Sequence, residues 1–213
     1  MTSARAVSVD RRWSRIALWL VATTLVYNVA EAVIALVAGV EADSIALFGF
    51  GLDSVIETAA ALMMLWRLAI EARGADVETI ERTEHVVHRF VGGTFLALAL
   101  YVTGQAGWNL WAQEAPQESV VGMVLAAASL VIMPLVSWGK LRAAREIGSA
   151  SLRAEARETL ACSYLSFALL LGLVANAAAG WWWADPVAAL LMVPWLIKEG
   201  REGLRGEGCC DDD

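Results

Sequence analysis

Cysteine, histidine and charged residues are scarce in this chain. Its 213 residues include three cysteines and two histidines, and 18% are charged, against about 25% in an average soluble domain. None of Cys162, Cys209 and Cys210 is predicted to lie on the outer, oxidising face of a membrane. We therefore expect free thiols rather than a disulfide framework. The net charge of −7 argues against a nucleic-acid partner.

Apolar residues are abundant instead, at 58% of the chain, which argues against a soluble or a disordered protein. A membrane-spanning helix needs about 20 mainly apolar residues. Six stretches have this character, the last being short: Ile16–Val40, Ser44–Trp66, Phe90–Trp111, Val120–Trp138, Leu160–Trp181 and Ala184–Ile197. The predicted fold class is all-α, a polytopic membrane protein with six transmembrane helices. The first stretch is too long for a cleavable signal peptide.

The basic residues orient this topology. All 16 Lys and Arg fall into four clusters, and six spans place every cluster on the same side as both termini. The positive-inside rule assigns that side to the cytoplasm. We predict a cytoplasmic segment at 1–15, a six-helix domain at 16–205 and a short acidic cytoplasmic tail at 206–213. The expected location is the lipid bilayer of the plasma (inner) membrane, and tryptophans near the span ends, such as Trp181, fit interfacial anchoring.

Carboxylates inside the spans are functional candidates, because a charge near the bilayer centre costs about 2.5–3.5 kcal/mol. Asp53 and Glu57 stand four residues apart in the second span and so share a helix face. Glu158 and Cys162 repeat this spacing at the start of the fifth span. Together the four side chains offer the oxygen and sulfur ligands of a tetrahedral metal site. The alternatives are a protonated carboxylate pair, a packing cysteine and a solvated Glu158.

The depth of these two pairs raises a difficulty. Asp53 lies about 21 Å along a helix from Arg67, whereas Cys162 lies about 7.5 Å from Arg157. If both arginines mark the inner interface, the pairs are not level. Either the fifth span begins inside a water-filled vestibule, or Glu57 is the main partner of Cys162 and Asp53 lies above them.

These motifs resemble those of the cation diffusion facilitator family over the six spans, roughly Ile16 to Arg205. The stretch Ser44–Glu57 is similar to the family's Asp-x-x-x-Asp motif in the second span, with Glu57 in place of the second aspartate. The tripeptide 184–186, Ala-Asp-Pro, is similar to the usual start of the sixth span. The resemblance implies a homodimer that exports divalent metal in exchange for protons, with both termini inside.

The fifth span departs from the family pattern. Glu158 and Cys162 stand where the family has His and Asp, and Glu155 is the competing choice of ligand. Replacing the histidine affects the expected zinc selectivity and removes a group that exchanges a proton near neutral pH.

Secondary candidates lie in the first span and in a loop. Asn28 and Glu31 share a face and form either a second coordination or proton site or an interhelical hydrogen bond. Glu84 ends a basic-x-Glu element, residues 82–84, that is similar to that of the family, and His85 and His88 follow it. They form either a surface metal site or, as we favour, part of an amphipathic juxtamembrane helix.

Most family members continue after the sixth span into a cytoplasmic metal-sensing domain. Here the chain stops shortly after Arg205, so we expect the transmembrane domain alone. The remaining tail holds Cys209 and Cys210 beside acidic residues, and it is either a weak metal site or a solvated acidic segment.

The sequence thus predicts a divalent metal transporter that works by proton antiport, with Zn, Cd, Co, Fe, Mn or Ni as cargo and no permanently bound cofactor. The alternative is a non-transporting metal-binding membrane subunit or regulator. An enzyme is not expected, because no Ser–His or Cys–His pair lies within the spans.

Overall fold

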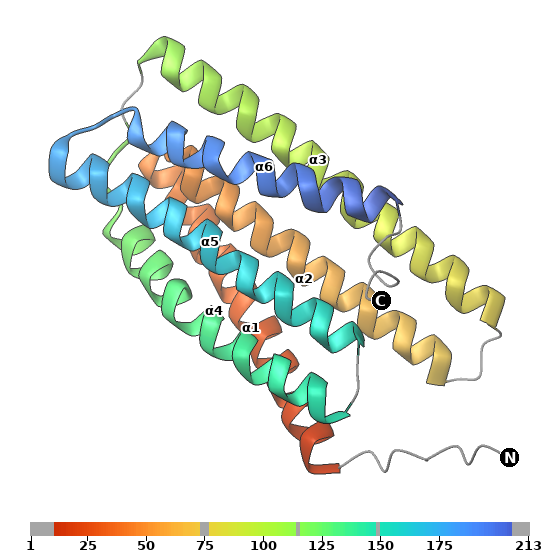
Figure 1. The fold of residues 1–213 in the computed structure, drawn as a ribbon. Coiled ribbons are helices and arrows are strands. Elements are labelled where there is room, and N and C mark those ends of the chain that lie inside the picture. Colours follow the sequence, from red (N-terminus) through yellow and green to blue (C-terminus); the bar gives the residue numbers. More distant parts are fainter. Residues whose placement is uncertain (1–10, 73–76, 114–115, 148–149, 206–213) are drawn as a thin grey trace, which may run out of the picture.

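The computed structural model describes residues 11–72, 77–113, 116–147 and 150–205, and these ranges are helical apart from short connections. Six helices follow one another: α1 Arg11–Ala42, α2 Ile45–Ala72, α3 Val77–Ala112, α4 Val120–Ile147, α5 Ala150–Ala179 and α6 Ala184–Arg205. They form an up-and-down bundle in which the described chain starts and finishes at the same end (Figure 1). The all-α prediction is confirmed for the described residues.

The helices extend beyond the apolar stretches at the end of the bundle that carries the basic clusters. For example, α3 begins at Val77, well before Phe90, and α4 continues past Trp138 to Ile147. A helix satisfies its own backbone hydrogen bonds, so it can continue where the sequence turns polar. The polar turns that extend α3 and α4 therefore lie at one end of the bundle.

Four helices are long and apolar enough to cross a membrane within the part of the chain that the structure describes: Arg15–Ala42, Arg89–Ala112, Val120–Ile147 and Glu155–Ala179. Large apolar side chains also cover the outside of the bundle, and Leu100 and Trp19 are 77% and 75% exposed. Such a surface is suited to lipid rather than to water. The multi-pass character is thus supported, and the count of six spans stays a prediction.

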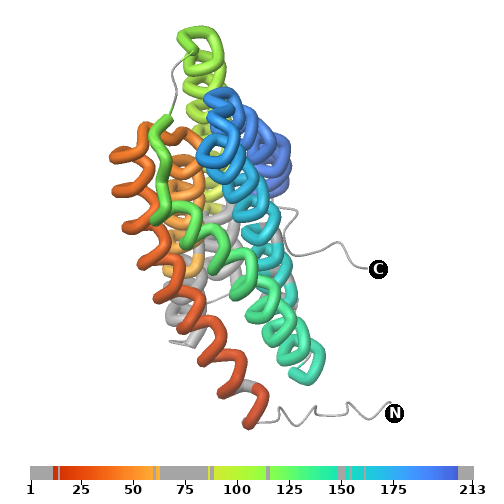
Figure 2. The backbone as a smooth tube through the Cα atoms, turned by 90° about the vertical axis from the view of Figure 1, so that its left-hand side faces the viewer, coloured from red at the N-terminus to blue at the C-terminus, as the bar shows by residue number. Residues whose placement is uncertain are grey.

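Helix α2 occupies the centre of the bundle and contacts α1, α3, α5 and α6. Helix α4 runs between α1 and α5 (Figure 2), and α3 packs along α6. Fully buried residues of α2 and α5, among them Leu47, Phe50, Leu165 and Leu169, form the apolar core. The central position of α2 means that its polar residues can meet groups from several helices.

The depth of α2 is fixed by Asp185, at the start of α6. The Asp185 carboxylate accepts hydrogen bonds from the Ser44 hydroxyl and from the backbone N–H groups of Ile45, at 3.0 Å, and Ala46, at 3.3 Å. The Ser44 Oγ accepts from the backbone N–H of Leu47 at 3.1 Å, as an N-cap does. This joint ties the first turn of α2 to that of α6.

Tryptophans mark both ends of the bundle, as expected. At the basic end, the Arg142 guanidinium lies 5.5 Å from the ring centre of Trp13 and 5.9 Å from that of Trp138. At the other end, Trp181 and Trp183 stack with their ring centres 5.2 Å apart. Rings with a polar edge are favoured where apolar surface meets water.

Candidate metal centre

Three of the four predicted ligands come together between α2 and α5. Ligand atoms of Asp53, Glu57 and Cys162 all lie within 4.8 Å of one another. Asp53 and Cys162 are each 2% exposed, and Glu57 is partly buried. The four-residue spacing stacks the two carboxylates on one face of α2, and α5 brings the thiol against that face.

The depth difficulty is resolved by Glu57. The Cys162 thiol donates a hydrogen bond to Glu57 Oε1, with 2.5 Å between sulfur and oxygen. Glu57 is therefore the direct partner of Cys162, as the second of our two explanations proposed, and Asp53 still lies within the same group. The projecting turns of α5, which begins at Ala150, make the distance from Cys162 to Arg157 a poor measure of depth.

Glu158 does not join this group in the structure. Its side chain is exposed, and its carboxylate lies outside the set of mutually close ligand atoms formed by the other three residues. Its charge interacts with that of Glu199 on α6. Glu158 thus lies outside the candidate centre, one turn of α5 before Cys162.

Glu155, the competing ligand, is engaged elsewhere. Its Oε1 lies 3.1 Å from the ammonium of Lys140, which is fully buried and also donates to Thr159 Oγ1 at 3.0 Å. The sequence places Lys140 among the basic residues of the inner face, and its burial between α4 and α5 is a finding of the tertiary structure. A lysine usually packs its hydrophobic stem and keeps its charge in water, so the sequence alone does not indicate that this ammonium is buried.

The first span supplies two buried polar residues beside the centre. Asn28 Nδ2 donates to Glu57 Oε2 at 2.9 Å. One turn later, Glu31 is 1% exposed and accepts hydrogen bonds from Ser54 Oγ on α2, at 2.9 Å, and from Ser129 Oγ on α4. Both predicted candidates therefore make interhelical hydrogen bonds. Ser54 and Ser129, which sequence reasoning did not single out, are identified only through this contact.

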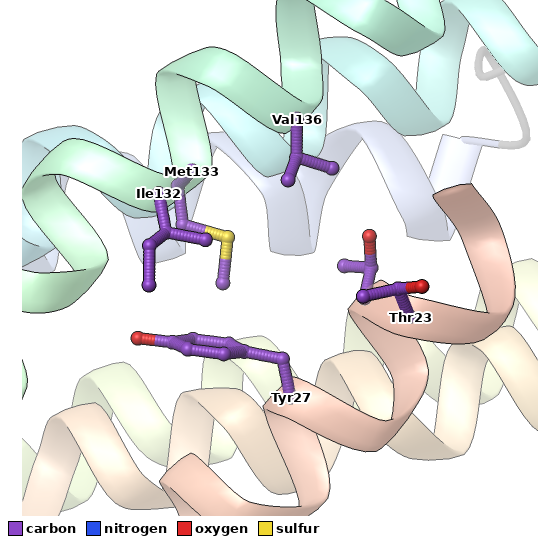
Figure 3. A pocket seen from close by; sticks show the side chains of 6 residues that line it. Thr23, Tyr27, Ile132, Met133 and Val136 are labelled. Atoms are coloured by element: carbon purple, nitrogen blue, oxygen red, sulfur yellow. The ribbon is translucent and has the colours of Figure 1, made fainter. Parts of the chain in front are cut away.

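Tyr27 extends the Glu31 network toward α4. Its hydroxyl lies 2.6 Å from Ser129 Oγ. The Tyr27 ring also borders a small hollow between α1 and α4 (Figure 3). This hollow, of about 30 Å³, is lined by Thr23, Thr24, Tyr27, Ile132, Met133 and Val136. It has room for about one water molecule and is separate from the three-ligand centre.

Glu199 adds a further carboxylate at the basic end of the bundle. It is partly buried on α6, beyond the predicted sixth span. Burial raises its pKa above the ordinary value of a glutamate, and the charge of Glu202 adds to this effect while Lys198 opposes it. A glutamate in this setting binds a proton more readily than one in water.

The remaining candidates lie outside the described part of the molecule. Glu84, His85 and His88 fall within α3, but their side chains are not described, and Cys209 and Cys210 follow the last described residue. Their predicted roles stay predictions.

The chemistry of the three-residue centre suits a divalent cation. Two carboxylates and a thiol would provide hard and soft ligands together once the thiol loses its proton. Asp53 Oδ1 is buried and has no hydrogen-bond partner among the described residues. Buried polar atoms are nearly always paired, so an acceptor of this kind indicates a group that binds there.

A helical bundle with an apolar surface and acidic groups buried between its helices defines a polytopic membrane protein. Residues 21–205 match the family described as the cation efflux transmembrane domain. The chain therefore belongs to the cation efflux family, in agreement with the resemblance seen in its motifs.

One curated relative carries a name that also refers to transport. It is the uncharacterized transporter sll1263 of Synechocystis, 26% identical over 150 residues that make up 69% of this chain and 48% of the relative. The chain thus spans about half the length of the curated relative that it matches.

Proposed function

We propose that this chain carries divalent metal cations across the plasma membrane and exchanges them for protons. The observation that carries the proposal is the convergence of Asp53, Glu57 and Cys162 from two helices, with ligand atoms within 4.8 Å of one another. Membership of the cation efflux family supports transport of a cation. Glu158, the fourth residue of the predicted set, lies outside this cluster, one turn of α5 before Cys162.

Proton exchange follows from the chemistry of the ligands. The Cys162 thiol carries a proton, through which it donates a hydrogen bond to Glu57. A divalent cation binds the thiolate and the ionised carboxylates, so loading the site releases protons. Their return after the cation leaves resets the site. One cation and the displaced protons then move in opposite directions.

Movement through the membrane is proposed to follow alternating access. Helices α2 and α5 hold the centre, and rocking of the bundle exposes it first to the cytoplasm and then to the opposite side. In this proposal the basic end of the bundle, with both termini, faces the cytoplasm. Two copies form a homodimer through apolar surface that is exposed in the single chain, as the family resemblance implies.

The test is transport by the purified chain in proteoliposomes. Metal uptake and proton movement are followed together, the second with a trapped pH-sensitive dye. We expect Asp53→Ala to abolish metal-dependent proton movement. The matched control is Asp43→Asn, because Asp43 is exposed at the end of α1 with φ 54°, a conformation that asparagine accepts. Its transport should equal that of the wild type.

Two results would contradict this function. Unchanged transport by Asp53→Ala would exclude the proposed centre. Metal binding by the wild-type chain without any flux would favour the alternative of a metal-binding subunit or regulator.

A further inference from the structure

Asn28 of α1 is in contact with the candidate centre, although it belongs to neither predicted motif. Its Nδ2 donates to Glu57 Oε2 at 2.9 Å, while the thiol of Cys162 donates to the other oxygen of the same carboxylate. The residue is 6% exposed. A third helix thus reaches the group formed by α2 and α5.

The oxygen of this amide is unpaired. Asn28 Oδ1 is buried and has no hydrogen-bond partner among the described residues, and the same holds for Asp53 Oδ1. The opposite orientation of the amide would place its oxygen against the Glu57 carboxylate, where two acceptors repel, so the contact with Glu57 fixes the amide. Because the amide nitrogen contacts Glu57, the amide oxygen bonded to the same carbon also lies near the centre, where a bound cation would satisfy this unpaired acceptor.

The donor count leads to the same residue. Asp53, Glu57 and Cys162 supply three close ligand atoms, and a tetrahedral site needs a fourth. Glu158 is exposed and lies outside that group. We propose that Asn28 Oδ1 is the fourth protein ligand of the transported cation, in the place that the sequence pattern assigned to Glu158. This inference rests on the proposed function, since it deepens the description of the same site.

The proposal gives α1 a direct role in selecting the cation. A neutral amide oxygen is a hard ligand, so the set becomes three oxygens and one sulfur, with a formal charge of −3 when the thiol and both carboxylates are ionised. The same amide keeps its hydrogen bond to Glu57 and so orients that carboxylate toward the cation. Asn28 would be a ligand and an orienting group at once.

The test is Co²⁺ binding to the full-length chain purified in detergent, measured by calorimetry and by the visible absorption of the bound ion. Four-coordinate Co²⁺ absorbs far more strongly than six-coordinate Co²⁺, so the spectrum reports ligand number independently of affinity. We expect Asn28→Leu to weaken binding by about tenfold or more and to change the spectrum. Asn28→Asp, which keeps an oxygen at the position, should retain the spectrum of the wild type.

Matched variants make every outcome decisive. Glu158→Gln should leave both readouts unchanged, and Asn28→Ala replaces Asn28→Leu if the larger side chain prevents folding. Loss of binding in Glu158→Gln with retention in the Asn28 variants would make Glu158 the fourth ligand and overturn the proposal. A weaker affinity with an unchanged spectrum in both apolar Asn28 variants would reduce Asn28 to a structural residue, which also overturns it. Full binding by Asp53→Ala would instead refute the underlying site.

Discussion

Lys140 and Glu155 form an ion pair between α4 and α5 with 3.1 Å between nitrogen and oxygen, and the two partners are buried to very different extents. The lysine side chain is 0% exposed and that of the glutamate is 32% exposed. Thr159 Oγ1 accepts a second hydrogen bond from the ammonium. One charge of the pair therefore depends on its partner, whereas the other can still reach solvent.

We predict an unequal response to breaking this pair. Glu155→Gln leaves a fully buried ammonium without a counterion and should lower the free energy of unfolding by about 3 kcal/mol. Lys140→Met leaves a carboxylate that reaches solvent and should cost only about 1–2 kcal/mol. The double variant should be close to the wild type, because it leaves no buried charge without a counterion. Thermal unfolding in detergent orders the four proteins.

The control for this series is Lys198→Met. Lys198 and Glu202 lie 3.8 Å apart, and their side chains are 65% and 45% exposed. An exposed pair of this kind contributes about 0–1 kcal/mol, so the unfolding temperature should scarcely change. Equal effects of Lys140→Met and Glu155→Gln would contradict the asymmetry that burial predicts.

The thiol of Cys162 should set the preference of the site for softer cations. Cys162→Asp replaces the only sulfur of the described cluster with oxygen, and thiolate is the ligand that favours Zn²⁺ and Cd²⁺ over Mn²⁺. We expect the ratio of Cd²⁺ to Mn²⁺ affinity to fall by about tenfold or more, which corresponds to about 1.4 kcal/mol. Binding measured across Zn, Cd, Fe, Co, Mn and Ni checks this prediction.

Ser166→Ala is the matched control on the same face of α5. Ser166 is fully buried, and its hydroxyl donates to the backbone carbonyl of Cys162 at 2.7 Å, so it does not engage the thiol. Its selectivity should equal that of the wild type. A Cys162→Asp protein with unchanged selectivity would show that the sulfur is not a ligand.

The contact between α3 and α6 depends on one of two neighbouring glycines. A Cβ on Gly92 would lie 2.7 Å from both the Gly200 carbonyl oxygen and the Leu204 nitrogen, whereas a Cβ on Gly93 would meet nothing within 4 Å. Small residues allow membrane helices to approach this closely. Gly92→Ala should therefore lower the free energy of unfolding by about 1–3 kcal/mol.

Gly93→Ala provides the comparison at the adjacent position. It has free space and removes the flexibility of a helical glycine, so its stability should be unchanged or about 0.5–1 kcal/mol higher. The intrinsic fluorescence of the ten tryptophans reports unfolding for both variants. A similar loss of stability in the two proteins would contradict the close approach of α3 and α6 at Gly92.

The sequence by itself determined the helical fold class and the common helix face of Asp53 and Glu57. Apolar stretches of spanning length predict the helices, because length and composition are local properties. The four-residue spacing of Asp53 and Glu57 fixes their common face for the same reason. Their meeting with Cys162 also agrees with the sequence, although the spacing to the nearest arginines suggested a mismatch in depth.

Only the tertiary structure decided which groups from different helices meet. It brought Asn28 to Glu57, separated Glu158 from the ligand cluster and engaged Glu155 with Lys140. A periodic pattern says which face of a helix is polar but not which neighbour covers it. That choice depends on the rotation and depth of each helix, and these are fixed by distant contacts such as the joint between Asp185 and the start of α2.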